Sequence, residues 1–103
     1  MALDSQKTAR VQAMGGRVTT VEEWLDLTPE EVAIIDMKIR LGELIKKHRR
    51  MQRLSQEHAA RILKTSQGRI SKLERGQASL DQLVWSMLAL GGSQEKLAKA
   101  ISG

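Results

Sequence analysis

Residues 54–76 read LSQEHAARILKTSQGRISKLERG, and their pattern of caps and apolar residues predicts the centre of the fold. Ser55 and Ser66 are of a residue type that caps the first turn of a helix, and a glycine such as Gly76 commonly follows the last turn. The spacing predicts a short helix over 56–63, a tight turn over 64–66 and a second short helix over 67–75. The apolar residues of these helices are Ala59, Ala60, Leu63, Ile70 and Leu73.

These two helices lie within the most basic part of the chain. Residues 37–76 carry twelve Lys and Arg against three Glu, a net charge of +9, although the whole chain of 103 residues carries only +5. Residues 19–36 hold six acidic side chains and no basic one, whereas 1–18 carry +2 and 77–103 are neutral. A basic block repels itself, and phosphate is the partner that most commonly compensates it. Two short helices and a tight turn in such a block are typical of a DNA-binding helix-turn-helix, with a solvated helix face as the alternative.

Upstream of the basic block the sequence predicts a long helix over 29–52. Thr28 and Glu31 match a capping box, and Pro29 takes the first helical position, where proline is favoured. The apolar residues of this helix fall on two sides. One side holds Ile34, Met37, Leu41, Leu44, Ile45, His48 and Met51, and the other holds Val32, Ile35 and Ile39. A helix that is apolar on both sides is buried on both sides, so we expect another segment or another copy of the protein to cover the second side.

A short helix predicted over 19–27 is the candidate for that cover. A second capping box, formed by Thr20 and Glu23, begins it. Its apolar residues are Val21, Trp24 and Leu25. The chain before it, residues 1–18, lacks a sustained apolar period and contains a Gly-Gly pair, so we expect a flexible arm there.

Downstream, serine caps predict two more helices, one over 80–90 and one after Ser93 that carries Leu97 and Ile101 on one side. The core side of the 80–90 helix holds Leu80, Leu83, Val84, Met87 and Leu90. Trp85 lies about 160° from the centre of that side, next to Leu88, so the domain's own core does not need it. Because aromatic side chains are enriched at protein interfaces, we expect Trp85 and Leu88 to mark an interface.

The composition agrees with an all-α fold. Aromatic residues make up only 2% of the chain and there is one Pro, which disfavours a sheet. The absence of Cys excludes disulfides and cysteine-based metal sites. We therefore predict a compact bundle of about five helices over 28–103, with the short N-terminal helix in addition. The sequence contains neither a signal-peptide core nor an apolar run of membrane-spanning length, so we expect no membrane partner and a cytoplasmic protein.

The part of the chain from Leu41 to Leu90 resembles the Cro/C1-type (XRE) helix-turn-helix family. The resemblance rests on Leu54-Ser55-Gln56, on the small pair Ala59-Ala60, on the pattern Ser-Gln-x-x-Ile-Ser-x-Leu-Glu-x-Gly over 66–76, and on Leu88-Ala89-Leu90-Gly91. Residues 21–31 are similar to the subset of this family that includes HigA-type antitoxins. The resemblance implies a lambda-repressor-like DNA-binding domain over 28–103 that acts as a homodimer on a palindromic operator.

In that family the second short helix of the motif lies in the major groove of DNA, so the resemblance assigns base recognition to residues 66–75. Glutamine can pair with an adenine edge there, and arginine or lysine can reach a guanine edge or a phosphate. Residues at the start of each short helix donate to phosphates. The DNA-binding residues implied in this way are Gln56, Ser66, Gln67, Gly68, Arg69, Ser71 and Lys72.

The family resemblance also carries expectations for Gly68, for the turn residue Lys64 and for the pair Arg49 and Glu74, and the apolar pattern carries one for His48. Gly68 lacks the side chain that the family has at this position, so one base contact is missing. Lys64 replaces the usual glycine of the turn, so we expect a left-handed backbone there at a cost of about 1 kcal/mol. Arg49 and Glu74 occupy positions that form an internal ion pair in the family. His48 lies on the apolar side of the long helix, so we expect it in the core rather than on a metal ion.

No pattern typical of catalysis or cofactor binding is present, so we expect neither an enzyme nor a cofactor nor a metal site. The sequence lacks His-Glu-x-x-His, a phosphate-binding glycine-rich loop and Gly-x-Ser-x-Gly. The first hypothesis is a repressor of transcription that binds double-stranded DNA as a homodimer, with the antitoxin of a toxin–antitoxin pair as a further role. The alternative is a protein-interaction module that neutralises a partner, such as a basic toxin, through its N-terminal helix. RNA binding is disfavoured because no aromatic stacking platform exists.

Overall fold

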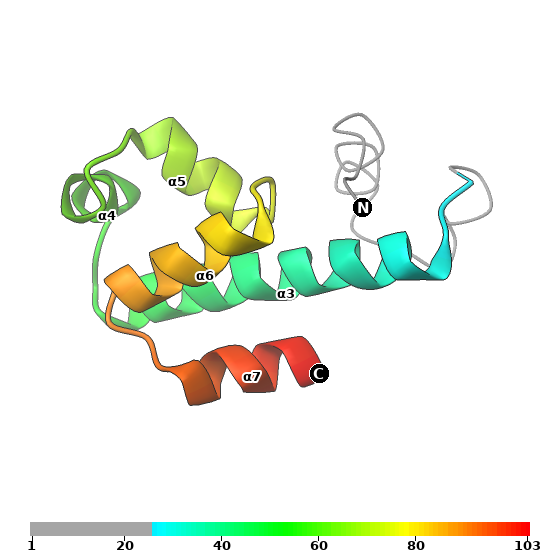
Figure 1. Cartoon of the computed structure of the whole chain (residues 1–103). Helices are drawn as coiled ribbons and strands as arrows, with labels where there is room; N and C mark the ends of the chain where they lie inside the picture. Colours follow the sequence, from blue (N-terminus) through cyan, green and yellow to red (C-terminus); the bar gives the residue numbers. More distant parts are fainter. Residues whose placement is uncertain (1–25) are drawn as a thin grey trace.

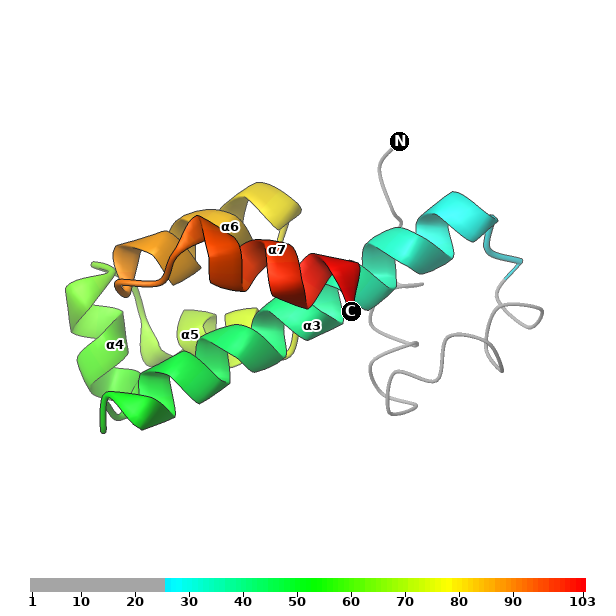
Figure 2. The same ribbon diagram turned by 90° about the horizontal axis from the view of Figure 1, so that it is seen from below.

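The structure is a computed structural model that describes residues 26–103. Five helices lie in this range: α3 (Pro29–Met51), α4 (Gln56–Ile62), α5 (Gln67–Glu74), α6 (Leu80–Ala89) and α7 (Gln94–Ser102). The long helix α3 runs the length of the domain, α5, α6 and α7 pack against it, and α4 packs against α5 (Figures 1 and 2). No strand occurs among the described residues, so the predicted all-α bundle is confirmed. None of the described helices is long and apolar enough to cross a membrane.

Every described helix begins at a serine or threonine that accepts a backbone N–H from its first turn. Thr28 Oγ1 accepts from the Glu31 N–H, and Glu31 Oε1 accepts from the Thr28 N–H, each at 3.2 Å. The predicted capping box of α3 is therefore confirmed. Each such cap stabilises its helix by about 1 kcal/mol. The other helices have caps of the same kind at Ser55, Ser66, Ser79 and Ser93.

Four consecutive helices, α3 to α6, end in the same motif. The residue after the last turn adopts a left-handed backbone, and the next N–H returns to a carbonyl of the last turn, as from Thr65 to Ala60 at 2.8 Å after α4. Glycine takes the left-handed position after α5 and α6, but Lys64 (φ 55°) takes it after α4 and Arg53 (φ 58°) after α3. The left-handed Lys64 was predicted, whereas nothing in the sequence indicated the one at Arg53.

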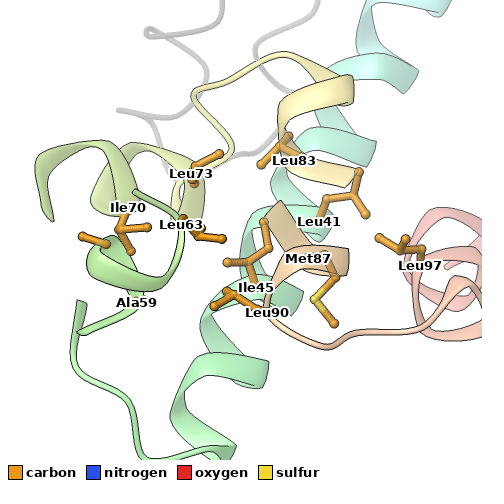
Figure 3. Close-up of a cluster of buried hydrophobic side chains, with 11 residues drawn as sticks. Leu41, Ile45, Ala59, Leu63, Ile70, Leu73, Leu83, Met87, Leu90 and Leu97 are labelled. Atoms are coloured by element: carbon orange, nitrogen blue, oxygen red, sulfur yellow. The ribbon is translucent and has the colours of Figure 1, made fainter. Parts of the chain in front are cut away.

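The core forms where α3, α5 and α6 meet, with contributions from α4 and α7 (Figure 3). Its members are Leu41, Ile45, Ala59, Ala60, Leu63, Ile70, Leu73, Leu83, Met87, Leu90 and Leu97. Each large aliphatic side chain buried here stabilises the fold by about 1.5–3 kcal/mol. His48 is also buried, and its Nε2 donates to the carbonyl oxygen of Leu90 at 2.9 Å. The prediction of a core histidine is therefore confirmed.

The C-terminal end of α3 differs from the expectation, whereas at its N-terminal end Ile35 of the second apolar side is covered as expected. Met51, predicted on the buried side, is 68% exposed because it is the last residue of the helix. Ile35 is fully buried although it does not belong to the central cluster, and Leu27 is buried in the same way. Asp26 and Leu27, the last two residues of the helix predicted over 19–27, are not helical. The rest of that helix and the predicted arm over 1–18 lie outside the described residues.

Candidate nucleic-acid interface

The helices α4 and α5 form a compact unit joined by the turn 63–66. In α5, Ile70 and Leu73 are buried in the core, which turns the opposite side of the helix outward. The structure places most of the predicted DNA-binding residues on this outward side. Ser66, Gln67, Gly68, Arg69 and Lys72 are exposed, and Ser71 is half-buried.

The outward side of α5 is unobstructed at Gly68. A Cβ atom added to this residue would meet no atom within 4 Å. Glycine inside a helix lowers its stability by about 1 kcal/mol relative to alanine, so packing and helix formation give no reason for a glycine here. Glycine does permit a close approach of the helix backbone to another molecule.

A series of hydrogen bonds joins Gln67, one of the predicted DNA-binding residues, to the interior. Gln67 Nε2 donates to Gln56 Oε1 at 2.6 Å, and Gln56 Nε2 donates to Glu74 Oε1 at 3.1 Å. Glu74 in turn forms a bidentate ion pair with Arg49, in which Nη2 lies 3.1 Å from Oε1. Arg49 also donates to the carbonyl oxygen of Leu54 at 2.7 Å. The ion pair between Arg49 and Glu74 that the family resemblance implied is confirmed.

Within the described residues, these hydrogen bonds leave one amide N–H and the amide oxygen of Gln67 without a partner, and Gln67 is exposed. One donor beside one acceptor is the pattern that an adenine edge requires in the major groove. Gln56 is half-buried and holds Gln67 from α4. The sequence predicted both Gln56 and Gln67 as DNA-binding residues, because each follows a helix cap. It gave no sign of the hydrogen bond between them.

The end of α5 touches the backbone of α3 directly. A Cβ atom at Gly42 would lie 2.7 Å from both the Gly76 nitrogen and the Leu73 oxygen. A Cβ atom at Gly76 would lie 2.7 Å from the Lys38 oxygen. Two glycines therefore let the two backbones meet, and together with the Arg49–Glu74 pair they fix the direction in which α5 points. Gly42 is the only glycine of α3, and that was the available signal for this contact.

The charge of residues 37–76 is almost entirely unpaired. Among the described residues the ion pairs are Arg40–Asp36, at 3.0 Å, and Arg49–Glu74. Ten of the twelve Lys and Arg of the block therefore have no carboxylate partner in that part of the chain. Arg69 and Lys72 are among these ten, and both are exposed on α5. Such an arrangement attracts polyanions.

The predicted interface residues fall into two groups. On α6, Trp85 is 60% and Leu88 is 41% exposed, so neither belongs to the core. A hollow of about 420 Å³ separates Trp85 from the turn residue Lys64 and from Arg69. On α3, Val32 and Ile39 are half-buried, and Ile35 is already buried within the chain itself.

Nothing in the described part of the chain gathers three residues that could hold a metal ion. In the comparisons with known proteins, a family of helix-turn-helix domains matches residues 24–95. The match spans α3 to α6 and the first residues of α7, and so includes the α4–α5 unit and its support. Neither a curated protein nor a solved structure matches the chain.

Proposed function

The chain belongs to the helix-turn-helix domain family, and on that premise we propose that it is a sequence-specific regulator that places α5 in the major groove of double-stranded DNA. The observation that carries the proposal is the outward side of α5, which is exposed and basic and is held rigidly from behind. The major groove is wide enough to admit one α-helix, and its base pairs present distinct donor and acceptor patterns.

The roles proposed for the side chains follow from their free groups. Gln67 reads an adenine with its remaining N–H and its oxygen. Arg69 and Lys72 contact a guanine edge or phosphates. The hydroxyl oxygens of Ser55 and Ser66 accept the capping N–H groups, so their O–H groups are free to donate to phosphates.

The test begins with selection of preferred duplexes from a random pool, followed by affinity measurements on every single-base variant of the selected site. Gln67→Ala should reduce discrimination at one base pair by about 1–3 kcal/mol and leave the others unchanged. The matched control is Gln94→Ala, an exposed glutamine on α7. Equal weakening on all sequences would contradict base reading by Gln67.

Salt dependence tests the electrostatic part separately. If a dimer neutralises about 6–10 phosphates, affinity should fall by roughly 10³–10⁵ between 50 and 200 mM salt. The ten basic residues of 37–76 that have no partner among the described carboxylates supply enough charge for this. An affinity that hardly changes with salt would contradict any nucleic-acid function.

We further propose a homodimer that represses transcription from a palindromic operator, with Trp85 and Leu88 at the contact between the two copies. Their exposure supports the proposal, since the large side chain of Trp85 is not used by the core. The two half-sites should lie about one DNA turn apart, roughly 34 Å. Trp85→Ala should produce a folded monomer in sedimentation that binds a full palindrome weakly. A dimer with unchanged affinity for the operator would contradict the contact.

The finer proposal is an antitoxin that represses its own gene. It is supported by the acidic stretch 19–36 beside the basic block, because an acidic segment suits a basic toxin. A short basic reading frame next to this gene, and co-purification of its product with this protein, would support the proposal. If deletion of residues 1–25, which removes Glu22 and Glu23, leaves toxin binding intact, the N-terminal part of the acidic stretch is not the toxin-binding site.

A further inference from the structure

A second hollow, of about 550 Å³, lies between the C-terminal half of α3 and helix α7. Its apolar surface comes from Leu44, Met51 and Ala100, and its cations are Lys47, Lys96 and Lys99. Its volume falls within the range of about 300–1,000 Å³ that is common for small-molecule sites. None of the predicted DNA-binding residues lines it.

The chemistry of this hollow is asymmetric. Met51 is 68% exposed, the largest exposed fraction among the exposed large apolar side chains of the described residues. The three lysines are also exposed, and none of them forms an ion pair with a described carboxylate. The hollow therefore combines an apolar surface open to solvent with cations that have no partner in the described part of the chain.

We propose that the hollow between α3 and α7 binds a small organic anion that carries an apolar body, such as an acyl or aromatic carboxylate, sulfonate or phosphate ester. The apolar body covers Leu44, Met51 and Ala100, and burial of that surface supplies the attraction. The anionic group meets the lysines Lys47, Lys96 and Lys99, which disfavour a cation at the same place.

The size of the hollow favours a small molecule over a protein segment. The lining comes from the last third of α3, from the nine-residue helix α7 and from Gly103 after it, whereas stable protein–protein interfaces bury about 1,200–2,000 Å² in total. DNA could pair with the lysines through its phosphates, but a phosphate backbone has no apolar body that would cover Met51 and Leu44. A ligand that has an apolar body and an anionic group matches both the apolar residues and the lysines of the hollow.

The experiment uses the full chain and two dyes that share the same aromatic rings. Anilinonaphthalene sulfonate carries an anionic group, and phenylnaphthylamine is the same body without it. In fluorescence titrations the sulfonate should bind at one saturable site, about tenfold or more tighter than the neutral dye. Equal affinity of the two dyes would overturn the proposal, because the lysines would then contribute nothing.

Variants assign the binding to this hollow. The double variant Lys96→Gln with Lys99→Gln should bind the sulfonate about tenfold more weakly and the neutral dye unchanged. Met51→Glu should weaken sulfonate binding as well, because it puts a negative charge on the apolar edge. All three positions are exposed, so circular dichroism should show the fold of the unmodified protein. The matched control is Arg61→Gln, an exposed cation on α4 outside the hollow. Unchanged sulfonate binding in both variants would overturn the assignment.

Competition separates the proposed ligand class from other anions. Dodecanoate, below its micellar concentration, should displace the sulfonate dye, whereas citrate at equal charge concentration should not. Displacement by citrate would indicate a site for charge alone and would overturn the proposal. Co-sedimentation with vesicles of phosphatidylglycerol, without displacement of the dye by free dodecanoate, would indicate a membrane surface instead and would also overturn it. None of these readouts requires DNA, so they do not depend on the proposed function.

Discussion

The two sides of α5 are built in opposite ways. On the inner side Ile70 and Leu73 are buried, Glu74 is paired with Arg49, and the end of the helix touches the backbone of α3. On the outer side Gly68 faces open space, and no carboxylate of the described residues pairs with Arg69 or Lys72. The packed inner side of α5 therefore supports an outer side that makes few contacts with the described part of the chain. Such an arrangement holds binding groups in place before a partner arrives, which lowers the cost of ordering them on binding.

Two helical glycines show the same contrast in a single residue type. Backbone atoms of α5 and of the turn after it lie within 2.8 Å of the position that a Cβ would take at Gly42, whereas nothing lies within 4 Å at Gly68. The sequence does not distinguish the two residues. Their different surroundings predict stability effects of opposite sign for the same substitution.

The largest effect should come from breaking the buried ion pair on the inner side of α5. Arg49→Met leaves the Glu74 carboxylate buried without its cation, and the loss of such a partner costs about 3–5 kcal/mol. Urea denaturation followed by circular dichroism measures this loss. Adding Glu74→Leu to Arg49→Met should recover much of it, because no buried charge then remains unpaired. A single variant that loses less than about 1 kcal/mol would mean that water reaches the pair.

Closing the contact between α3 and α5 should have the next largest effect. Gly42→Ala forces the methyl group against backbone atoms that cannot rotate away, and overpacking of this kind costs about 1–3 kcal/mol. The displaced end of α5 should also weaken DNA binding. Thermal melting and affinity for the selected duplex measure the two effects. A melting temperature equal to that of the unmodified protein would contradict a close backbone contact between α3 and the end of α5 at Gly42.

Gly68→Ala is the matched substitution on the open side and should stabilise the protein. Alanine improves helix formation by about 0.5–1 kcal/mol, and its methyl group meets no protein atom. If α5 enters the major groove, the same methyl group lies where the helix backbone approaches DNA. We therefore expect higher stability together with weaker operator binding, measured on the same preparation. Binding as tight as that of the unmodified protein would show that no close approach occurs at Gly68.

Local sequence signals explain which parts of this structure could be predicted. The serine and threonine caps located every described helix, and the family resemblance supplied the Arg49–Glu74 pair. Contacts that depend on tertiary packing left little signal or none. The only glycine of α3, Gly42, indicated a close approach without showing that Gly76 is its partner, and nothing indicated the hydrogen bond from Gln67 to Gln56. Periodicity also misjudged Met51, because a helical pattern does not reveal where the covering helices stop. The roles of the predicted DNA-binding residues and of Trp85 remain predictions.

The turn between α4 and α5 should respond more weakly. Lys64 holds a left-handed backbone with φ 55°, which costs a residue with a Cβ about 1 kcal/mol. Lys64→Gly removes that strain but increases the freedom of the unfolded chain, so the net gain should stay below about 1 kcal/mol. Lys64→Ala is the control for loss of the charge, since alanine keeps the strain. A glycine variant no more stable than the alanine variant in urea denaturation would contradict strain at this residue.

The smallest effect should be a pH dependence from Lys38, which lies where α3 supports the end of α5. Its carbonyl oxygen is part of the contact with Gly76, and burial lowers the pKa of its ammonium group below the ordinary value of 10.5. The unfolded chain then holds this proton more tightly than the folded protein does. At neutral pH Lys38 therefore lowers the free energy of unfolding by its full contribution. This contribution decreases as the pH rises through the pKa of the folded state towards 10.5, because the ammonium group then loses its charge. Lys38→Met should accordingly be more stable than the unmodified protein at about pH 7, and the difference should narrow as the pH rises towards 10.5.

The chain suits this measurement because it contains no Tyr and no Cys, so lysines are the side chains that titrate in the alkaline range. The matched control is Lys46→Met, at an exposed lysine of the same helix, which changes the net charge equally. Urea denaturation of all three proteins at a series of pH values compares them directly. A stability difference between Lys38→Met and the unmodified protein that stays constant across the alkaline range would contradict a lowered pKa for Lys38.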